Sequence, residues 1–235
     1  GTFAFSSDLY HDRMLWGGTL RSPHPSARIR SVDISAAVAV TGVHAVLTNE
    51  DVPGSLTYGL EHRDQPVLAA DVVRYEGEPV AIVAADNPEA VRMAIDAIAV
   101  DYEPLDPLVD PDLAERADPI HPDGNLVRRI NLIHGDQDVR GEVQVEGTYE
   151  VGMQDQAFLG PESGMAVPAE DGGIDLYVAT QWLHSDRDQV ADCLGLDPAR
   201  VRLTLSGVGG AFGAREDLSL HVHLCMLALH TRRPV

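Results

Sequence analysis

The sequence has no lysine and a shortage of positive charge, which excludes one broad class of partner. All 17 basic residues are arginine, and they stand against 37 acidic residues, giving a formal net charge of −20. A chain with this acidic excess repels phosphate backbones, so it is not expected to bind nucleic acid. The acidic residues are spread over both halves of the chain, a pattern typical of a surface that keeps a protein in solution.

Cysteine and long apolar runs are also scarce. Cys193 and Cys225 are the two cysteines, and they form no Cys-x-x-Cys pair. Their spacing excludes a disulfide framework and a zinc ribbon, and predicts two reduced thiols in the interior. No apolar run approaches the ~20 residues of a membrane span. We therefore expect no membrane segment and a cytoplasmic location.

The first half of the sequence predicts several strands and one helix. Asn87 can cap a helix whose first position is Pro88, and apolar residues then recur at helical spacing. The expected strands are too short and uneven for a β-sandwich. They cover residues 14–20, 29–34, 43–48, 67–69, 72–75, 79–85 and 100–103.

The second half begins after a stretch rich in proline and aspartate at residues 106–123, which predicts a linker running to about residue 138. One helix is expected over 185–195, begun by Ser185 and ended by Gly195, and another over 218–229. Val235 is expected to start a further strand of the same sheet, so this unit is expected to continue beyond the sequence. The other strands are expected at 143–149, 165–168, 174–180 and 201–205.

A glycine-rich loop, residues 207–213 (GVGGAFG), lies between the last expected strand and the last expected helix. Glycines let a backbone approach a ligand closely, and a helix N-terminus offers free N–H groups to an anion. The loop is not a dinucleotide fingerprint, because Phe212 occupies the third glycine position, and it lacks the Gly-Lys-Ser/Thr of a P-loop. From spacing alone, a structural turn and a ligand-binding loop are equally favoured.

Other polar residues also have both a structural and a functional interpretation. Glu216 is either an acid in the first turn of a helix, where it suits the helix dipole, or an acceptor for a heterocycle N–H. Ser163 does not fit the Gly-x-Ser-x-Gly nucleophile motif, because Pro161 replaces the first glycine. His221 and His223 are two apart on an expected helix and would point to different faces, which favours packing or solvent contact over metal binding.

Seven stretches, spread over nearly the whole chain, match one known family in its own order. They are LRSPHPSARI (20–29), VLTNEDVPG (46–54), VLAADVVRYEGEPVAIVAAD (67–86), VDYEPL (100–105), MQDQAFLGPES (153–163), ATQWLHSDRDQVADCLGL (179–196) and VGGAFGARED (208–217). Together they resemble the molybdenum-cofactor subunit of xanthine dehydrogenases, within the molybdenum hydroxylases that also include aldehyde oxidases.

The resemblance implies an α+β fold: an α/β hammerhead domain over 1–120, a linker over 121–142, and over 143–235 the truncated start of a mixed α/β molybdopterin-binding domain. It also implies site residues. The family's glutamine beside the molybdenum falls on Gln154, and the turn that meets the cofactor falls on Phe212, flanked by Gly210 and Gly213. Gln154 and Phe212 would lie near the metal without being ligands to it. Glu216 would be the carboxylate that orients a purine.

The implied activity is hydroxylation of a purine such as xanthine or hypoxanthine, with water as the oxygen source. The implied cofactor is molybdenum-molybdopterin, with 2Fe-2S clusters and FAD on partner subunits. The family's substrate-activating glutamate and its guanidinium partner would lie beyond Val235, so this chain is expected to need the remainder of its subunit for turnover. Two alternatives stay open: hydroxylation of an aldehyde or another N-heterocycle, and a non-catalytic scaffold that docks partner subunits.

Overall fold

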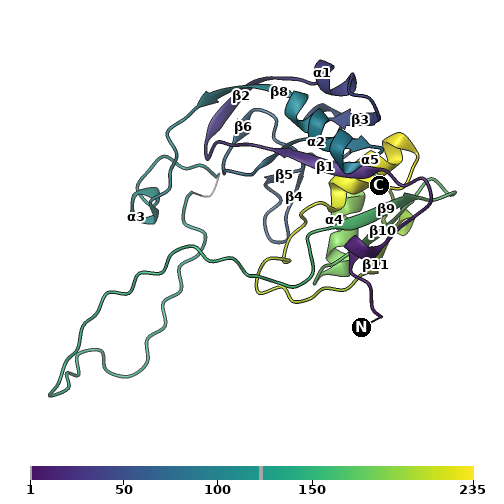
Figure 1. The fold of residues 1–235 in the computed structure, drawn as a ribbon. Coiled ribbons are helices and arrows are strands. Elements are labelled where there is room, and N and C mark those ends of the chain that lie inside the picture. Colours follow the sequence, from purple (N-terminus) through teal and green to yellow (C-terminus); the bar gives the residue numbers. More distant parts are fainter. Residues whose placement is uncertain (1, 122–123) are drawn as a thin grey trace. The chain divides into compact units, whose positions relative to one another are not determined.

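The computed structural model describes residues 2–121 and 124–235, and the chain divides into two compact units. The main unit contains the residues up to Leu105 together with Gln156–Val235. The connecting unit runs from Asp106 to Asp155. Segments from the two ends of the sequence therefore fold together in the main unit (Figure 1).

The first part of the main unit is built around β7 (Pro79–Ala85), whose seven residues are all buried. It is the central strand of a sheet ordered β1-β7-β3, antiparallel to both neighbours, while β2 is central in a second sheet ordered β6-β2-β8. Short helical turns are η1 (Ser6–Asp8), α1 (Ser35–Val38) and η2 (Asn49–Asp51). The remaining strands are β1 (Trp16–Arg21), β2 (Ala27–Asp33), β3 (Val43–Leu47), β4 (Thr57–Tyr58), β5 (Gln65–Pro66), β6 (Val72–Val73) and β8 (Ala99–Pro104).

Helix α2 (Pro88–Ala97) begins as the sequence predicts. The side chain of Asn87 accepts a hydrogen bond from the backbone N–H of Ala90 at 2.9 Å, and Pro88 occupies the first helical position. The helix packs on β1 and β7. Gly18 of β1 permits this close approach, because a Cβ at that position would collide with Val91.

The second part of the main unit contains β9 (Gly164–Pro168), β10 (Ile174–Val178) and β11 (Val201–Leu205), in the order β11-β10-β9. Strand β10 is antiparallel to β9 and parallel to β11. The crossover from β10 to β11 consists of α4 (Leu183–Leu194) and η3 (Pro198–Arg200). Val235 exchanges two backbone hydrogen bonds with Ala166, at 2.9 and 3.0 Å, so it pairs with β9 as expected.

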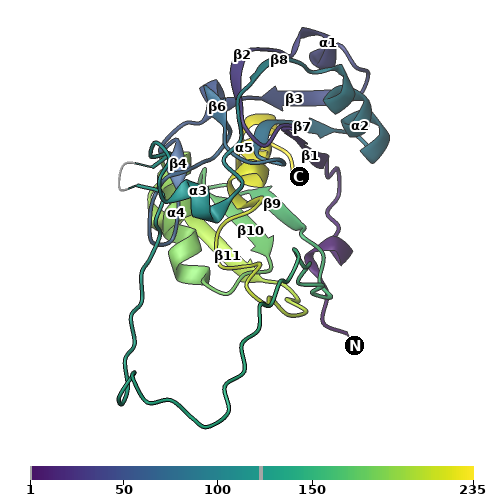
Figure 2. The ribbon, with the colours of Figure 1, turned by 90° about the vertical axis from the view of Figure 1, so that its left-hand side faces the viewer.

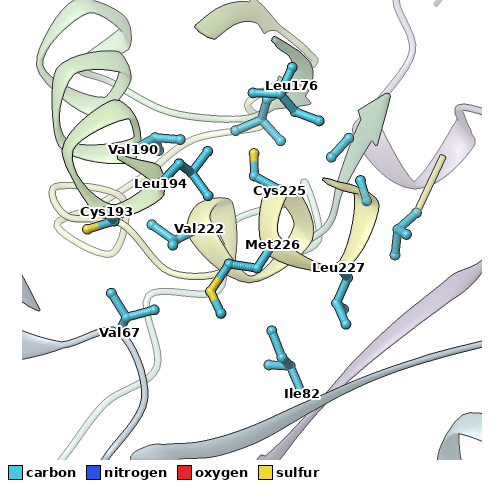
Figure 3. Close-up of a cluster of buried hydrophobic side chains, with 14 of the residues drawn as sticks. Val67, Ile82, Leu176, Val190, Cys193, Leu194, Val222, Cys225, Met226 and Leu227 are labelled. Atoms are coloured by element: carbon cyan, nitrogen blue, oxygen red, sulfur yellow. The ribbon is translucent and has the colours of Figure 1, made fainter. Parts of the chain in front are cut away.

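Helix α5 (His221–Thr231) forms the centre of the largest core cluster. It contacts β9 and β10 as well as β3 and β7. Figure 3 shows Cys225 facing Leu176 of β10, with Leu227 on the side of Ile82 from β7. Cys193 and Cys225 are both buried and unpaired, which confirms the prediction of interior thiols.

In its described residues, the connecting unit contains one short helix, α3 (Pro111–Ala114), capped by Asp110, whose carboxylate accepts from two backbone N–H groups. The strand expected at residues 143–149 is wrong. Val145 and Tyr149 are more than nine-tenths exposed, and in the described part of the chain no strand lies beside them to complete a ladder. Residues 122 and 123 of the expected linker lie outside the described residues.

Three other expectations also need correction. Residues 67–69 are buried but not a strand: the Val67 N–H donates to Leu56 and the Ala69 N–H donates to Pro79, so the segment bridges two different partners. Helix α4 starts at Leu183, not at Ser185, although Gly195 ends it as predicted with a φ of 63°. Helix α5 starts three residues later than expected.

Two views show these helices packed in the main unit (Figures 1 and 2). None of the described helices is long and apolar enough to cross a membrane.

Candidate functional site

The candidate site lies at the edge of the sheet where β10 and β11 end. Because these two strands are parallel, the chain leaves both of them at the same edge, the usual position of ligands in such sheets. Residues 179–182 follow β10, and residues 206–213 follow β11. A hydrogen bond of 3.0 Å from the Ser206 N–H to the Val178 carbonyl holds the two departing segments together.

The glycine-rich loop at this edge has a backbone conformation that most side chains avoid. The φ angles of Gly209, Gly210 and Gly213 are 69°, 98° and 83°, and that of Phe212 is 53°. Among the described residues, none accepts a hydrogen bond from a backbone N–H of positions 208–213. Successive free N–H groups in such turns form a concave donor surface for electronegative atoms. The side chain of Phe212 is exposed.

The loop is held in this shape by contacts with two other segments. The carbonyl of Gly209 accepts a hydrogen bond of 2.9 Å from the Leu159 N–H, and the N–H of Gly207 donates to Ala4 at 2.9 Å. A side chain at Gly209 would collide with the backbone of Gly160. The first part of the loop, residues 207–209, is therefore packed against these two segments.

Arg215 also holds the glycine loop and the segment before β9 together. Its guanidinium is buried and donates to the carbonyl of Gly160, while its Nη1 lies 3.2 Å from Glu162 Oε1. The other oxygen of Glu162 accepts a hydrogen bond of 2.7 Å from Ser219. The segment before β9 is thus a polar connection tied to the loop by a buried cation.

The carboxylate of Glu216 is anchored through one of its two oxygens. Its Oε2 accepts hydrogen bonds from Gln181 Nε2 and Trp182 Nε1, each at 3.1 Å. Its Oε1 has no hydrogen-bond partner in residues 2–121 and 124–235. The helix-dipole interpretation of Glu216 is wrong, because the residue precedes α5 in an irregular segment and the first turn of α5 holds no acid.

Gln181 is a neighbour of Glu216 that the sequence analysis did not single out. The ungapped match places the family glutamine at Gln154, which belongs to the connecting unit and has an exposed side chain. Gln181, in contrast, lies beside Glu216 within the main unit. One feature of the sequence could have indicated Gln181: it directly follows one expected strand, and the glycine loop directly follows the next. If the two strands are parallel neighbours, the segments that follow them lie at the same edge of the sheet.

His221 and His223 have a packing role, as the sequence favoured. Both are buried, and burial lowers the pKa of each to about 4. His223 donates from Nε2 to the carbonyl of Val67 at 2.7 Å, and His221 accepts at Nδ1 from the Ser219 N–H at 3.3 Å. In the described ranges, no three His, Cys, Asp or Glu side chains gather as they would around a metal ion.

The fold and this site define a class of protein: an α+β chain whose second sheet carries a cradle of backbone donors and a carboxylate at its carboxyl edge. Two family profiles match the chain. The a/b hammerhead domain of aldehyde oxidase and xanthine dehydrogenase matches residues 1–106, and the molybdopterin cofactor-binding domain matches residues 121–235. The chain belongs to this family of molybdenum hydroxylases and corresponds to an N-terminal part of it, with the hammerhead domain followed by part of the molybdopterin cofactor-binding domain. The expected fold class is confirmed.

Named relatives agree with this assignment and differ in their substrates. A probable xanthine dehydrogenase subunit of Bacillus subtilis (strain 168) is 37% identical over 240 residues, covering 100% of this chain and 32% of the relative. The nicotinate dehydrogenase large molybdopterin subunit of Eubacterium barkeri is also 37% identical over 240 residues, covering 100% of this chain and 56% of the relative. The crystal structure of quinoline 2-oxidoreductase from Pseudomonas putida 86 superposes with a TM-score of 0.85 at 27% identity, covering 98% of this chain and 31% of that one. The chain thus spans from about a third to a little over half of these proteins.

Proposed function

We propose that this chain is the front part of a molybdenum hydroxylase subunit that oxidises a purine, xanthine or hypoxanthine, with water as the oxygen source. The observation that carries the proposal is the pairing of free backbone N–H groups at 208–213 with the half-anchored carboxylate of Glu216, at the edge where β10 and β11 end. The donors would bind electronegative atoms of a cofactor, and the carboxylate would accept a hydrogen bond from a substrate.

The cofactor proposed is molybdenum-molybdopterin, and the loop fits it on two counts. Its backbone donors are uncharged, so they can bind oxygen or sulfur atoms of a cofactor without adding charge to a site whose metal is held by the pterin. The exposed turn at Gly210, Phe212 and Gly213 leaves those donors accessible. When bound, the molybdenum centre supplies the redox chemistry, and the protein's part is to orient it and its substrate.

Among the side chains, we propose that an amide accompanies these backbone donors. Gln154 and Gln181 are both candidates: the first follows from the family match, and the second from its contact with Glu216. Phe212 lies in the turn that would meet the cofactor. Neither Phe212 nor the amide would be a direct ligand of the metal.

Glu216 favours a substrate with a ring N–H, since its Oε1 is an acceptor and an aldehyde offers no such donor. The main alternative is an acidic or neutral N-heterocycle of another kind, because the nicotinate dehydrogenase relative is as similar to this chain as the xanthine dehydrogenase relative. A scaffold without catalytic activity is the alternative from a different class. We further propose partner subunits carrying 2Fe-2S clusters and FAD, the C-terminal remainder of this subunit as a required part, and a cytoplasmic location.

The test uses the complete enzyme purified without tags from its source. Molybdenum per polypeptide is measured by elemental mass spectrometry, and kcat/KM is measured for xanthine, hypoxanthine, nicotinate and an aromatic aldehyde. Near-stoichiometric molybdenum with a preference for purines, lost in Glu216→Gln, supports the proposal. Absence of molybdenum favours the scaffold, and an unchanged purine kcat/KM in Glu216→Gln removes Glu216 from the site.

A further inference from the structure

The segment between β10 and α4 presents two N–H donors to one oxygen of Glu216. One donor is the amide of Gln181, and the other is the indole of Trp182. The indole ring is about half exposed, at 45%, so burial of the ring does not by itself explain its place. What distinguishes this tryptophan is the bond from its Nε1 to a carboxylate at the candidate site.

The backbone of Trp182 is fixed by two further hydrogen bonds. Its N–H donates to Thr180 Oγ1 at 3.1 Å, and its carbonyl accepts from the N–H of Asp186 at 2.9 Å. These bonds set the direction in which the indole leaves the chain at the start of α4.

Thr180 is held in turn by a buried acid. Its hydroxyl donates to Asp186 Oδ2, and both side chains are almost inaccessible, at 5% and 1% exposure. A hydroxyl has one proton to donate, and here it is committed to Asp186, so its lone pair is free to accept from Trp182. Asp186, Thr180 and Trp182 therefore form a chain of hydrogen bonds in which every donor points toward an acceptor.

We propose that Trp182 is a positioning residue for substrate, supported by Thr180 and Asp186, a role that rests on the proposed function of Glu216. The two donors hold Oε2 of Glu216 and orient the plane of its carboxylate, so that Oε1 is presented as a single acceptor for a ring N–H. A ligand whose ring offers a lone pair in that place meets a like dipole and is disfavoured. Trp182 thus favours heterocycles that donate a hydrogen bond at this position.

The experiment compares Trp182→Phe with Trp16→Phe in the complete enzyme. Trp16 is the other tryptophan of this chain, is exposed to the same degree at 47%, and lies on β1. Loss of the indole N–H should raise the KM for the purine roughly 3- to 10-fold, with kcat within 2-fold and molybdenum content unchanged, because one of the two hydrogen bonds that orient the partly exposed Glu216 carboxylate is removed. Trp16→Phe should leave KM unchanged.

A second pair of variants tests the support. Thr180→Val removes the hydroxyl at nearly constant shape and should raise the KM for the purine as Trp182→Phe does. Thr180→Ser keeps a hydroxyl, so its KM should equal that of the unmodified enzyme. In a Glu216→Gln background, Trp182→Phe should have little additional effect, since the two act through one bond. If Glu216→Gln impairs purine turnover while Trp182→Phe and Thr180→Val behave like the unmodified enzyme, the positioning role is overturned. If Glu216→Gln itself has no effect, the proposed function of Glu216 fails instead.

Discussion

The guanidinium carbon of Arg215 lies 4.3 Å from the centre of the Phe158 ring. The same side chain, only 4% exposed, donates to the Gly160 carbonyl and pairs with Glu162. One arginine thus joins the segment before β9 to the segment after the glycine loop. These contacts hold together two irregular stretches that are far apart in sequence and that border the candidate site.

Arg215→Met should weaken the contact between these two stretches. The substitution keeps an apolar contact with Phe158 but removes the donor of the Gly160 carbonyl and the cation beside Glu162 Oε1, at a cost of about 2 kcal/mol in the free energy of unfolding. Hydrogen exchange of residues 207–213 should become faster. Arg92→Gln, which removes an exposed ion pair with Glu89, is the control and should change neither quantity. Equal exchange rates in Arg215→Met and the unmodified chain would show that the order of residues 207–213 does not depend on the arginine.

Gly209→Ala should damage the loop more than replacement of a glycine elsewhere that also has a positive φ. Gly209 and Gly77 both have positive φ, at 69° and 95°, but a Cβ on Gly209 would collide with Gly160 whereas a Cβ on Gly77 has open space. Both variants carry the strain of a positive φ, on the order of 1–3 kcal/mol, and only the first displaces the loop. Elemental analysis of the complete enzyme should find less molybdenum per polypeptide in Gly209→Ala and an unchanged molybdenum content in Gly77→Ala. Equal metal contents would argue against the loop as a cofactor contact.

The two glutamine candidates can be separated directly. Gln181→Ala removes an amide that contacts Glu216, whereas Gln154→Ala removes an exposed side chain of the connecting unit. If Gln181 is the amide beside the cofactor, its variant should lower kcat at least 10-fold and Gln154→Ala should leave kcat within 2-fold, a loss of the size expected for one electrostatic donor at a reacting centre. Steady-state kinetics with both variants decides the matter, and the reverse pattern would assign the role to Gln154.

Acid should destabilise the main unit through its buried histidines. Burial lowers the pKa of His223 to about 4, against about 6.5 for a histidine in the unfolded chain. Between these values the unfolded chain binds a proton that the folded chain does not, so stability falls as the pH is lowered from about 6.5 to about 4. His223→Gln should reduce this slope in melting temperatures measured from pH 4 to pH 8. His11→Gln, at an exposed histidine, should not alter it.

Asp186 should act with the opposite sign. Burial raises its pKa to about 6, above the value of about 3.9 for an unfolded aspartate. Between these values the folded chain holds a proton that the unfolded chain releases, so this group destabilises the fold increasingly as the pH rises from about 4 to about 6. Asp186→Asn, which still accepts from Thr180, should gain in melting temperature relative to the parent chain at pH 7 and lose that gain at pH 4. The same difference at both pH values would mean that the carboxyl does not titrate in this range.

Local sequence determined most of the individual elements. Asn87 and Pro88 start α2 because a side-chain acceptor and a fixed φ are properties of those residues alone, and Gly195 ends α4 for a similar reason. The apolar run of β7 could only be a buried strand or helix, and its length favoured a strand. These features depend on neighbours within a few residues, and they were predicted within one or two positions.

Local sequence could not predict whether an expected strand finds a partner, or which residues far apart in the chain come into contact. Residues 143–149 alternate as a strand does, yet a strand also needs a ladder, and none lies beside them in the described chain. Gln181 and Glu216 are neighbours because β10 and β11 are parallel, a fact set by the crossover through α4 and by the core around α5. The sequence by itself determined the family, most of the elements and the glycine loop. Only the tertiary structure decided which polar side chains meet, because pairing of distant strand ends is settled by packing and not by any local propensity.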